Sequence, residues 1–515
     1  MQVTETADVA DYKEGDGGPA EKIEEERGGS RDDPQKSYTV SEYMEKLGHG
    51  NYTRWVTFVM SLVSFADNAE IAVTAVIIRA LVCEWNLNNL QKALIPALIL
   101  TGEAIGSFCA GKLADIFGRR IVMLYCYYGI CTLSVVSIFA ESYYVYLIAR
   151  TLVGVFVGSC FPIAACYLHE MSPVPTRAQN LTIFSLIAET GSVFVCVCAL
   201  FLMELKHGWR LELTAILAVT LLTLFFLHFI DESPRYFAIT DDKTRATEVL
   251  RKIAHVNLVE MPRGTLETST EKRGRYVDFI KQPNTRMSII FSIISFCLMY
   301  TLNGMYYTVA DLLSYGYCNL YDFFISTYTD QNGCVLYTEG QYLFYLVIHL
   351  TALPGIILGG VSAELVGRVP SVIGSNWAIL FFAACLIVCL YYIVTIANMV
   401  ILILVLYLAV CVLWIYAPEI YPTYMRTTSV GILNSFNRAG GAAGSFVAEY
   451  VDDFDFMITL YSYIAVQAIA SIVTLYIKKE TKGVVLEDRR PESILERVSV
   501  TSYGAAQHHD DQRLE

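Results

Sequence analysis

Residues 115–119 read Asp-Ile-Phe-Gly-Arg, and the related sequence Glu-Leu-Val-Gly-Arg returns 249 residues later at 364–368. Each of these segments follows a long apolar run. A second motif and a single acidic residue recur at the same offset: Glu170-x-x-Pro173-x-x-x-Arg177 returns as Glu419-x-x-Pro422-x-x-x-Arg426, and Asp231 returns as Glu480. Three matches at one offset indicate that the chain is built from an internal duplication.

The composition places this duplication in a membrane protein. The chain has 515 residues, of which 55% belong to the AVILMFWYC set and 17% are charged, and its mean hydropathy is +0.45. A soluble globular protein averages about 25% charged residues. The net charge of −13 argues against a nucleic-acid-binding protein, which needs a basic surface.

Twelve runs of the chain are apolar over the roughly 20 residues that a helix needs to cross a bilayer. Lipid offers the backbone no hydrogen-bond partners, so these runs must be helices. We therefore predict an all-α membrane protein of twelve transmembrane helices in two six-helix repeats, with a binding site between the repeats. The predicted helices lie near 55–80, 91–111, 121–140, 144–166, 180–203, 210–230, 287–310, 342–362, 371–393, 398–418, 428–449 and 456–477.

Polar segments divide the chain into five parts. We expect a disordered acidic tail over 1–53, a first six-helix half over 54–230, a linker over 231–286, a second half over 287–478, and a C-terminal tail over 479–515. Most of the 37 Lys and Arg residues then lie on the side of both termini. The positive-inside rule predicts that both tails and the linker are cytosolic.

The predicted outside loop 311–341 contains two of the 14 cysteines, Cys318 and Cys334. An oxidising compartment would permit a disulfide between them. Cys83 is a competing partner, and two free thiols are the remaining alternative.

Several stretches resemble signatures of the major facilitator superfamily: residues 111–120 its loop 2–3 motif, 150–158 its helix 4 motif, 231–235 its PESPR element, and 479–483 the end of its helix 12. More narrowly, 65–70, 83–85, 306–307 and 416–423 are similar to the synaptic vesicle 2-related and vesicle glycoprotein group, which neighbours the organic ion transporters. The resemblance implies a symporter, antiporter or facilitator that works by alternating access.

The repeated acids and arginines lie at helix ends on the predicted cytosolic side. Paired across neighbouring helices, they would close the cytosolic mouth, and separated, they would let the halves move. The resemblance implies the same gating role; the alternative is that the charges only anchor helix ends. The first-half cluster comprises Asp115, Arg119, Glu170, Arg177, Glu232 and Arg235, and the second-half cluster comprises Glu364, Arg368, Glu419, Arg426 and Glu480.

Ionisable groups inside spans are costly and therefore indicate functional sites. Asp67 and Glu70 lie three residues apart and share a helix face. Two close carboxylates interact, and one can keep a proton near neutral pH. This pair is a candidate proton carrier or cation site; a structural pair satisfied by hydroxyl groups is the alternative.

Asn434 and Arg438 share a face of the predicted eleventh helix. Arg438 needs a carboxylate, from the protein or from a substrate. The resemblance to organic ion transporters implies anionic or zwitterionic cargo for an Arg at this place. The repeat offset makes Glu189 its counterpart, and a Glu189–Arg438 pair between the halves is the structural alternative.

Five further residues are candidates for the cavity wall. Glu103 is an acid within the second predicted span, and His349 is a lone histidine that is either structural or pH-sensing. Tyr306, Tyr307 and Trp414 can stack on a substrate or a cation, although aromatic residues also pack in ordinary helix contacts.

No Walker A, zinc-binding or nucleophile-elbow motif is present in the sequence. We therefore expect no enzyme, no cofactor and no metal, but a monomeric, secondary active or facilitative transporter of a small charged or zwitterionic organic solute. Protons are the candidate coupling ion, and the substrate's own gradient is the alternative driving force. A sugar or organic cation facilitator and a non-transporting vesicle membrane protein that binds a ligand or partner are the alternatives. The resident membrane is the plasma membrane or an intracellular vesicle.

Overall fold

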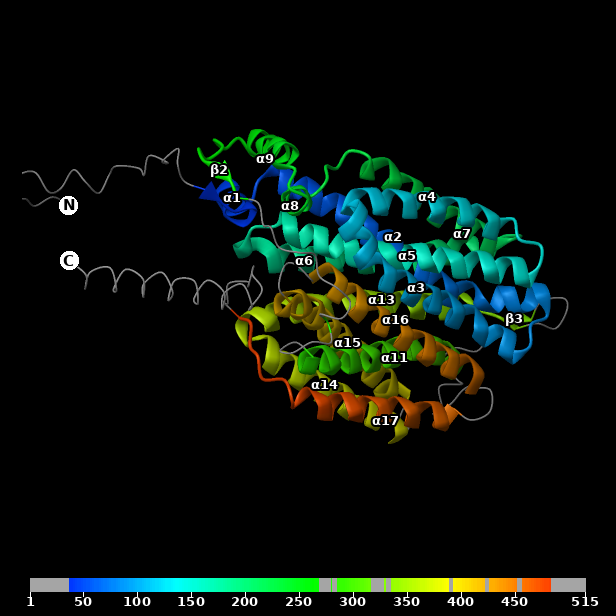
Figure 1. The fold of residues 1–515 in the computed structure, drawn as a ribbon. Coiled ribbons are helices and arrows are strands. Elements are labelled where there is room, and N and C mark those ends of the chain that lie inside the picture. Colours follow the sequence, from blue (N-terminus) through cyan, green and yellow to red (C-terminus); the bar gives the residue numbers. More distant parts are fainter. Residues whose placement is uncertain are drawn as a thin grey trace, which may run out of the picture.

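The computed structural model describes residues 37–267, 279, 285–315, 328–329, 335–388, 392–421, 426–451 and 456–482. Long helices run back and forth along one direction and form a single elongated bundle (Figure 1). Helices of the first half and of the second half lie in separate parts of this bundle, the former in blue to green and the latter in green to orange.

The first half contributes six long helices. Polar residues between apolar runs set their ends: Asn88 and Gln91 form a capping box at the start of α3, and the Ser142 side chain accepts a hydrogen bond from the Val145 N–H at the start of α5. The elements are α2 (Asn51–Trp85), α3 (Asn89–Phe117), α4 (Arg119–Ile138), α5 (Tyr143–Met171), the short η1 (Val174–Thr176), α6 (Arg177–Leu202) and α7 (Gly208–Leu227).

The second half contributes six more long helices. They are α11 (Thr285–Tyr315), α13 (Glu339–Leu365), α14 (Arg368–Cys385) with the short η3 (Leu386–Val388), α15 (Tyr392–Ile420), α16 (Arg426–Val451) and α17 (Phe456–Thr474). Two short strands, β3 (Tyr328–Thr329) and β4 (Val335–Leu336), pair antiparallel between α11 and α13.

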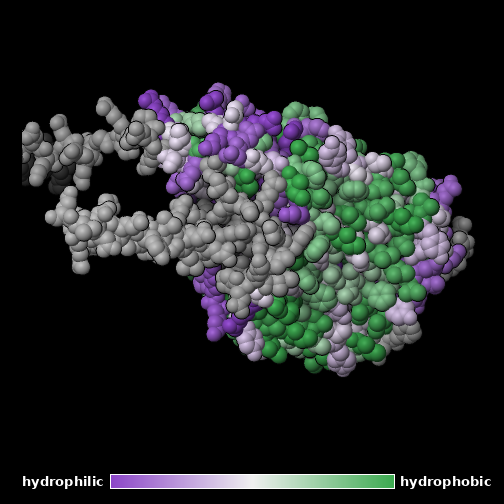
Figure 2. Space-filling view, viewed as in Figure 1, coloured by the Kyte–Doolittle hydropathy of each residue, from purple (hydrophilic) through white to green (hydrophobic). Residues whose placement is uncertain are grey.

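Eleven of the described helices are long and apolar enough to cross a membrane. The remaining predicted span, 428–449, is the eleventh along the chain and corresponds to α16, a helix of 26 residues whose polar members include Asn434, Asn437 and Arg438. It packs between α3 and α11, so these polar groups face protein. Figure 2 shows hydrophobic side chains around the middle of the bundle and hydrophilic side chains at both ends, as expected for a protein that spans a bilayer.

Small elements cover one end of the bundle, where α3 passes into α4 and α13 into α14. We call this the motif end, because the repeated motifs lie there. Its cover consists of β1 (Ser37–Tyr38), α1 (Val40–Leu47), α8 (Pro234–Ile239), α9 (Lys243–Asn257) and β2 (Thr265–Leu266), with β1 and β2 paired in parallel.

Residues 37–53 differ from the expected disordered tail. Tyr43, Met44 and Leu47 of α1 are buried, and α1 packs on α8 and α9. The physical reason is the amphipathic pattern of α1, which presents one apolar face to the bundle. The part of the predicted tail that precedes residue 37 lies outside the described residues.

The two halves meet mainly where α3 packs on α16 and α6 packs on α13. At the motif end, a Cβ atom added to Gly431 of α16 would lie 2.8 Å from the Ser107 carbonyl oxygen of α3. At the opposite end, an apolar cluster joins α2, α3 and α5 of the first half to Tyr307, Tyr345 and Ala448 of the second. The halves therefore touch at both ends, with a space between them.

Candidate functional site

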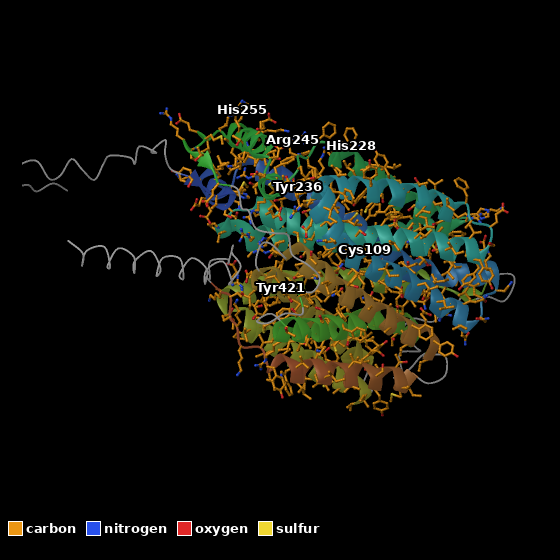
Figure 3. All side chains as sticks on the ribbon, viewed as in Figure 1. Cys109, His228, Tyr236, Arg245, His255 and Tyr421 are labelled. Carbon is orange, nitrogen blue, oxygen red and sulfur yellow. The ribbon has the colours of Figure 1, made fainter. Side chains whose placement is uncertain are left out.

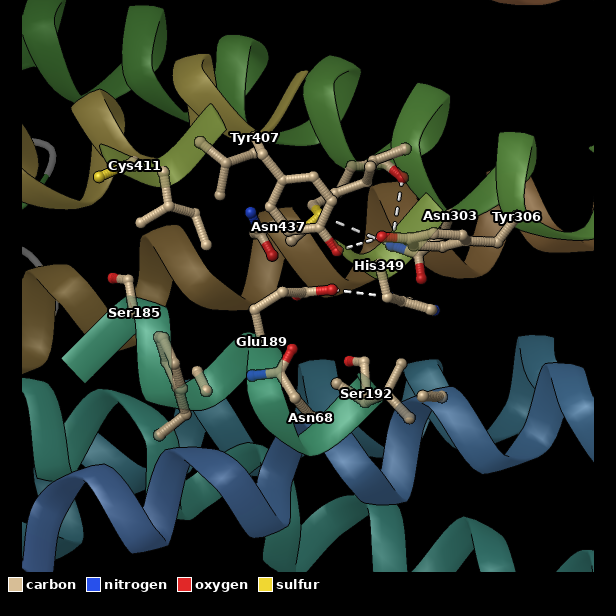
Figure 4. Close-up of a pocket in the computed structure, with 18 of the residues that line it drawn as sticks. Asn68, Ser185, Glu189, Ser192, Asn303, Tyr306, His349, Tyr407, Cys411 and Asn437 are labelled. Atoms are coloured by element: carbon tan, nitrogen blue, oxygen red, sulfur yellow. Dashed lines mark hydrogen bonds and ion pairs between the residues drawn. The ribbon is translucent and has the colours of Figure 1, made fainter. Parts of the chain in front are cut away.

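A cavity of about 100 Å³ lies between the two halves. Its wall includes Asn68, Ser185 and Ser192 of the first half and Asn303 and Asn437 of the second (Figure 4). Seven of the predicted cavity residues line it: Glu189, Tyr306, Tyr307, His349, Trp414, Asn434 and Arg438. The other three predicted residues, Asp67, Glu70 and Glu103, lie behind the wall and are not in its lining.

Glu189 and His349 form a contact between the halves across this cavity. The Glu189 Oε1 atom lies 2.6 Å from His349 Nδ1, and both side chains are buried (Figure 4). The Tyr306 ring stacks on the His349 ring with a centroid distance of 4.9 Å, and the Tyr306 and Tyr407 hydroxyl groups are hydrogen-bonded. Four helices, α6, α11, α13 and α15, thus supply one polar chain along the cavity.

The predicted alternative of a Glu189–Arg438 pair is wrong. Arg438 instead contacts two other carboxylates, with its Nη2 atom 2.8 Å from Asp67 Oδ2 and its Nε atom 3.1 Å from Glu103 Oε2. The reason is helix packing: α16 lies against α3 and α11, whereas α6 lies against α13. We call Asp67, Glu103 and Arg438 the triad; it joins α2 and α3 of the first half to α16 of the second.

Asp67 and Glu70 have separate arginine partners. The Glu70 Oε2 atom lies 2.5 Å from Arg150 Nη1, and Arg150 Nη2 also donates to the Glu70 backbone oxygen at 3.1 Å. Ser134 donates a weaker hydrogen bond of 3.4 Å to Glu70. The two carboxylates are close in sequence, but each is compensated by its own guanidinium, Asp67 by Arg438 and Glu70 by Arg150.

Two glycines of α5 bring Glu103 to this place. A Cβ atom added to Gly154 would lie 2.4 Å from the Ile99 carbonyl oxygen, and one added to Gly158 would lie 2.2 Å from the Glu103 carbonyl oxygen. Only a residue without a side chain permits so close an approach of two backbones. One motif of α5 therefore has two effects, since its glycines hold the backbone of α3 close and its arginine pairs with Glu70. The motif is Arg150-x-x-x-Gly154-x-x-x-Gly158.

At the motif end, the first-half charges form a compact network. Arg119 Nη2 lies 3.0 Å from Glu170 Oε1 and 3.4 Å from Asp115 Oδ1, and Glu170 accepts a hydrogen bond of 2.6 Å from the Ser233 hydroxyl. Tyr236 of α8, labelled in Figure 3, lies over the same turn, with the Arg119 guanidinium 5.7 Å from its ring.

Glu232 completes this network through the backbone. It accepts hydrogen bonds of 3.0 Å from the Arg119 and Arg120 N–H groups, beside Gly118, whose φ of +101° permits the turn. Burial raises the pKa of the Glu232 carboxyl, and the hydrogen bonds from the Ser233 N–H and these amides act against the rise. The carboxylate therefore caps the first turn of α4.

The second half repeats this geometry. Arg368 Nη2 lies 3.1 Å from Glu419 Oε1, and Glu480 accepts hydrogen bonds from the Arg368 and Val369 N–H groups at 3.1 and 2.9 Å. Burial acts to raise the pKa of Glu480, but four backbone N–H donors outweigh it and hold the pKa below its ordinary value. Glu364 is exposed and has no ion-pair partner among the described residues.

Three predicted gate arginines make other contacts. Arg177 donates to the Ser172 carbonyl oxygen at 3.4 Å, Arg426 donates to the Pro418 carbonyl oxygen at 2.9 Å, and Arg235 is buried beside them. The ion pairs described at the motif end lie within one half each. One polar contact that crosses between the halves there is the Thr428 hydroxyl, which donates to Asp115 at 3.0 Å.

Sequence reasoning missed two further contacts between the halves among the described residues, in addition to those of Glu189, Arg438 and Thr428. Asn434 donates a hydrogen bond of 2.8 Å to Ser107, and Lys92 Nζ lies 2.5 Å from Glu449 Oε2 at the opposite end, where both side chains are buried. The signal for the second was present in the sequence, since Lys92 and Glu449 are charged residues at the ends of two predicted spans.

The cysteine prediction lies largely outside the described residues, since Cys318 and Cys334 are not among them. Cys83 at the end of α2 is disulfide-bonded, which favours the alternative in which Cys83 takes part. Among the described residues, His, Cys, Asp and Glu form no group of three that could hold a metal ion.

The chain matches the family model described as "Sugar (and other) transporter" over residues 55–491. It therefore belongs to this family. It is an integral multi-pass membrane protein that transports a small solute, and it is not an enzyme.

Relatives cover most of the chain. It is 27% identical over 460 residues to "Putative transporter svop-1" of Caenorhabditis elegans, which covers 88% of this chain and 87% of that protein. It is 26% identical over 468 residues to "Synaptic vesicle 2-related protein" of Bos taurus (88% and 83% covered). It is also 26% identical over 452 residues to "Organic cation/carnitine transporter 7" of Arabidopsis thaliana (81% and 89% covered).

A solved structure shares the fold. The proton:xylose symporter XylE, bound to 6-bromo-6-deoxy-D-glucose, superposes with a TM-score of 0.64 over 85% of this chain and 98% of XylE, at 17% identity. The likeness extends to the partially occluded inward-open form of XylE from E. coli, with a TM-score of 0.63 over 84% of this chain and 100% of XylE, at 17% identity. The predicted all-α fold and the resemblance to the synaptic vesicle 2-related group are confirmed.

Proposed function

We propose that this protein carries a small organic cation across its membrane by alternating access of the cavity between its halves. The observation that carries this proposal is the pairing of Arg438. Two carboxylates, Asp67 and Glu103, already compensate its guanidinium. An anionic substrate would have to compete with both carboxylates for Arg438. The resemblance to the organic ion transporters implied anionic cargo, but this pairing argues against it.

Glu189 is the carboxylate that the cavity offers to a cation. It lines the cavity, and its ion-pair partner there is the His349 imidazole. A histidine is charged only in part near neutral pH, whereas an arginine is always charged. An ammonium group that enters the cavity can therefore replace His349 at Glu189 and form a stronger pair.

Aromatic side chains support the same ligand chemistry. Tyr306 stacks on His349 and is hydrogen-bonded to Tyr407, and Trp414 packs on Phe161 with a ring-centroid distance of 5.1 Å. All four aromatic side chains line the cavity. Aromatic faces attract cations and bind quaternary ammonium groups well. The relative named as an organic cation/carnitine transporter is consistent with this assignment.

Transport would proceed by movement of the halves around this cavity. The polar contacts that cross between the halves at the motif end (Thr428 to Asp115) and at the opposite end (Lys92 to Glu449) are the ones that opening must break. The arginine networks within each half would keep each half rigid while it moves. The gate at the motif end is therefore the junction between the two networks.

The test is uptake of radiolabelled tetraethylammonium into proteoliposomes containing the purified protein, compared with p-aminohippurate as the anion and xylose as the sugar. We expect saturable uptake of the cation alone. Glu189→Gln should reduce this uptake at least tenfold, because a hydrogen bond to a charged group is worth about 1.5–3 kcal/mol. Glu212→Gln is the matched control, because Glu212 is a buried carboxylate outside the cavity lining.

Other results would select another function. Uptake of xylose without tetraethylammonium would support the sugar facilitator. Saturable binding without uptake would support a non-transporting membrane protein. Uptake of p-aminohippurate, lost in Arg438→Gln and kept in Glu189→Gln, would overturn the proposal.

A further inference from the structure

The charges around the triad do not balance. Asp67, Glu70 and Glu103 supply three carboxylates, and Arg150 and Arg438 supply two guanidinium groups; these side chains are between 1% and 7% exposed. With every group ionised, this buried set would hold one negative charge in excess. An uncompensated charge away from water is costly, and a carboxyl group avoids the cost by keeping a proton.

Hydrogen bonding singles out one of the three carboxylates. Glu70 has Arg150 at 2.5 Å and accepts a further hydrogen bond from Ser134. Asp67 Oδ2 accepts a hydrogen bond of 2.8 Å from Arg438, whereas its Oδ1 atom is buried without a donor among the described residues. Glu103 lies 3.1 Å from the Nε atom of the same guanidinium, and its Oε2 atom is buried without a hydrogen-bond donor among the described residues. Glu103 is the least compensated of the three.

We propose that Glu103 is the carboxyl group that binds the exchanged proton, rather than Asp67 or Glu70, and that the protein is a proton/organic cation antiporter. This inference rests on the proposed cation transport. The proton on Glu103 and the cation paired with Glu189 each add one positive charge to the same buried region, so each should weaken the binding of the other. Arg438 connects them, because it contacts Glu103 and also lines the cavity.

The exchange is balanced in atoms and charge. When the cation enters the cavity, the O–H bond of the Glu103 carboxyl breaks and its proton passes to water, leaving the carboxylate beside Arg438. When the cation leaves on the other side, Glu103 takes a proton from water there. One positive charge is bound in each state, so the halves move with the buried set neutralised.

The titratable and charged groups around Glu103 come from four helices. They are Asp67 and Glu70 of α2, Arg150 of α5, Tyr307 of α11 and Arg438 of α16. The tyrosine is neutral at physiological pH and the arginines stay charged. The titration therefore lies among the three carboxylates, and an isosteric amide at each position in turn can locate it.

The experiment measures tetraethylammonium binding to purified protein as a function of pH. Competition with one proton predicts that the Kd of wild-type protein rises about tenfold for each pH unit of acidification below the pKa of the site. Glu103→Gln should bind the cation weakly, as wild type does at low pH, with a Kd that does not change with pH. Glu103→Asp should restore the pH dependence, and Glu212→Gln should keep it.

A second measurement requires no substrate. Infrared difference spectra of the substrate-free protein are taken between alkaline and neutral pH in the Glu212→Gln background, because the Glu212 carboxyl is also buried without a hydrogen-bond partner among the described residues. They should show the C=O band of one protonated carboxylic acid. This band should disappear in Glu103→Gln and remain in Asp67→Asn and Glu70→Gln. If the protein binds no cation but the band behaves as expected, the proposed substrate fails and the proton site stands.

Three results would overturn the inference. The first is a carboxylic-acid band that persists in Glu103→Gln. The second is pH-dependent cation binding that persists in Glu103→Gln and is lost in Asp67→Asn. The third is pH-dependent binding that persists in Glu103→Gln and is lost in His349→Gln, which would assign the exchange to the Glu189–His349 pair instead.

Discussion

Arg438→Gln should destabilise the protein itself, in addition to any effect on substrate binding. The guanidinium lies 2.8 Å from Asp67 and 3.1 Å from Glu103, and all three side chains are at most 7% exposed. Removal of one partner from a buried ion pair costs about 3–5 kcal/mol, because the other charge stays buried without compensation. Here the change leaves the Asp67 carboxylate without its ion-pair partner, whereas Glu103 can remain neutral by keeping its proton, so the free energy of unfolding should fall by at least about 3 kcal/mol.

A second variant separates this charge effect from a loss of packing. Asp67→Asn combined with Arg438→Gln removes the pair as a unit, and replacement of both partners of a buried ion pair is often nearly neutral. The double variant should recover most of the stability that the single variant loses. Arg210→Gln is the control, because the Arg210–Glu84 pair at 3.3 Å is about 30% exposed, and exposed pairs are worth about 0–1 kcal/mol.

Unfolding in mixed detergent micelles, followed by tryptophan fluorescence, gives the free energy of each variant. The reasoning would be refuted if Arg438→Gln unfolded like wild type, since Arg438 would then not compensate the buried carboxylates. A double variant no more stable than the single one would also contradict it, because the loss would then come from packing.

Two further predictions concern the α3–α5 contact and the motif end. Gly158→Ala should lower the free energy of unfolding and the rate of cation uptake, because its Cβ would lie 2.2 Å from the Glu103 carbonyl oxygen. Gly374→Ala is the control, because nothing lies within 4 Å of a Cβ at that position. Unfolding and uptake measured side by side should both be unchanged in the control. The lowered pKa of Glu480 contributes stability above the unfolded-state pKa of about 4.3, and this contribution is lost as the pH falls through the folded-state pKa. Acid titration of unfolding should therefore show a stability gap between wild type and Glu480→Gln that is constant near neutral pH and closes in acid; a gap that stays open in acid would contradict this assignment.

Much of the fold could be predicted from the sequence. The apolar runs fixed the positions of the helices, because a backbone in lipid must satisfy its own hydrogen bonds. The offset of 249 residues predicted that Arg119 and Arg368 are equivalent. The structure places both arginines in the same kind of turn, and each pairs with the glutamate 51 residues further on, Glu170 or Glu419. The spacing of the motifs was sufficient to predict these two charge networks, since each network lies within one half.

The partners of Arg438 could not be predicted in this way. The repeat offset favoured Glu189, and Asp67 and Glu70 looked like one pair because they are three residues apart. Helical periodicity shows which residues share a face, but it does not show which neighbouring helix that face meets.

Tertiary packing decided these contacts. Gly154 and Gly158 of α5 bring α3 close to α5, and Gly431 of α16 brings α16 close to α3. Asp67, Glu103 and Arg438 therefore meet although they are far apart in the sequence. The sequence by itself determined a duplicated twelve-helix membrane transporter with costly buried charges. Only the tertiary structure determined which charges compensate one another, because that depends on the rotation and proximity of whole helices.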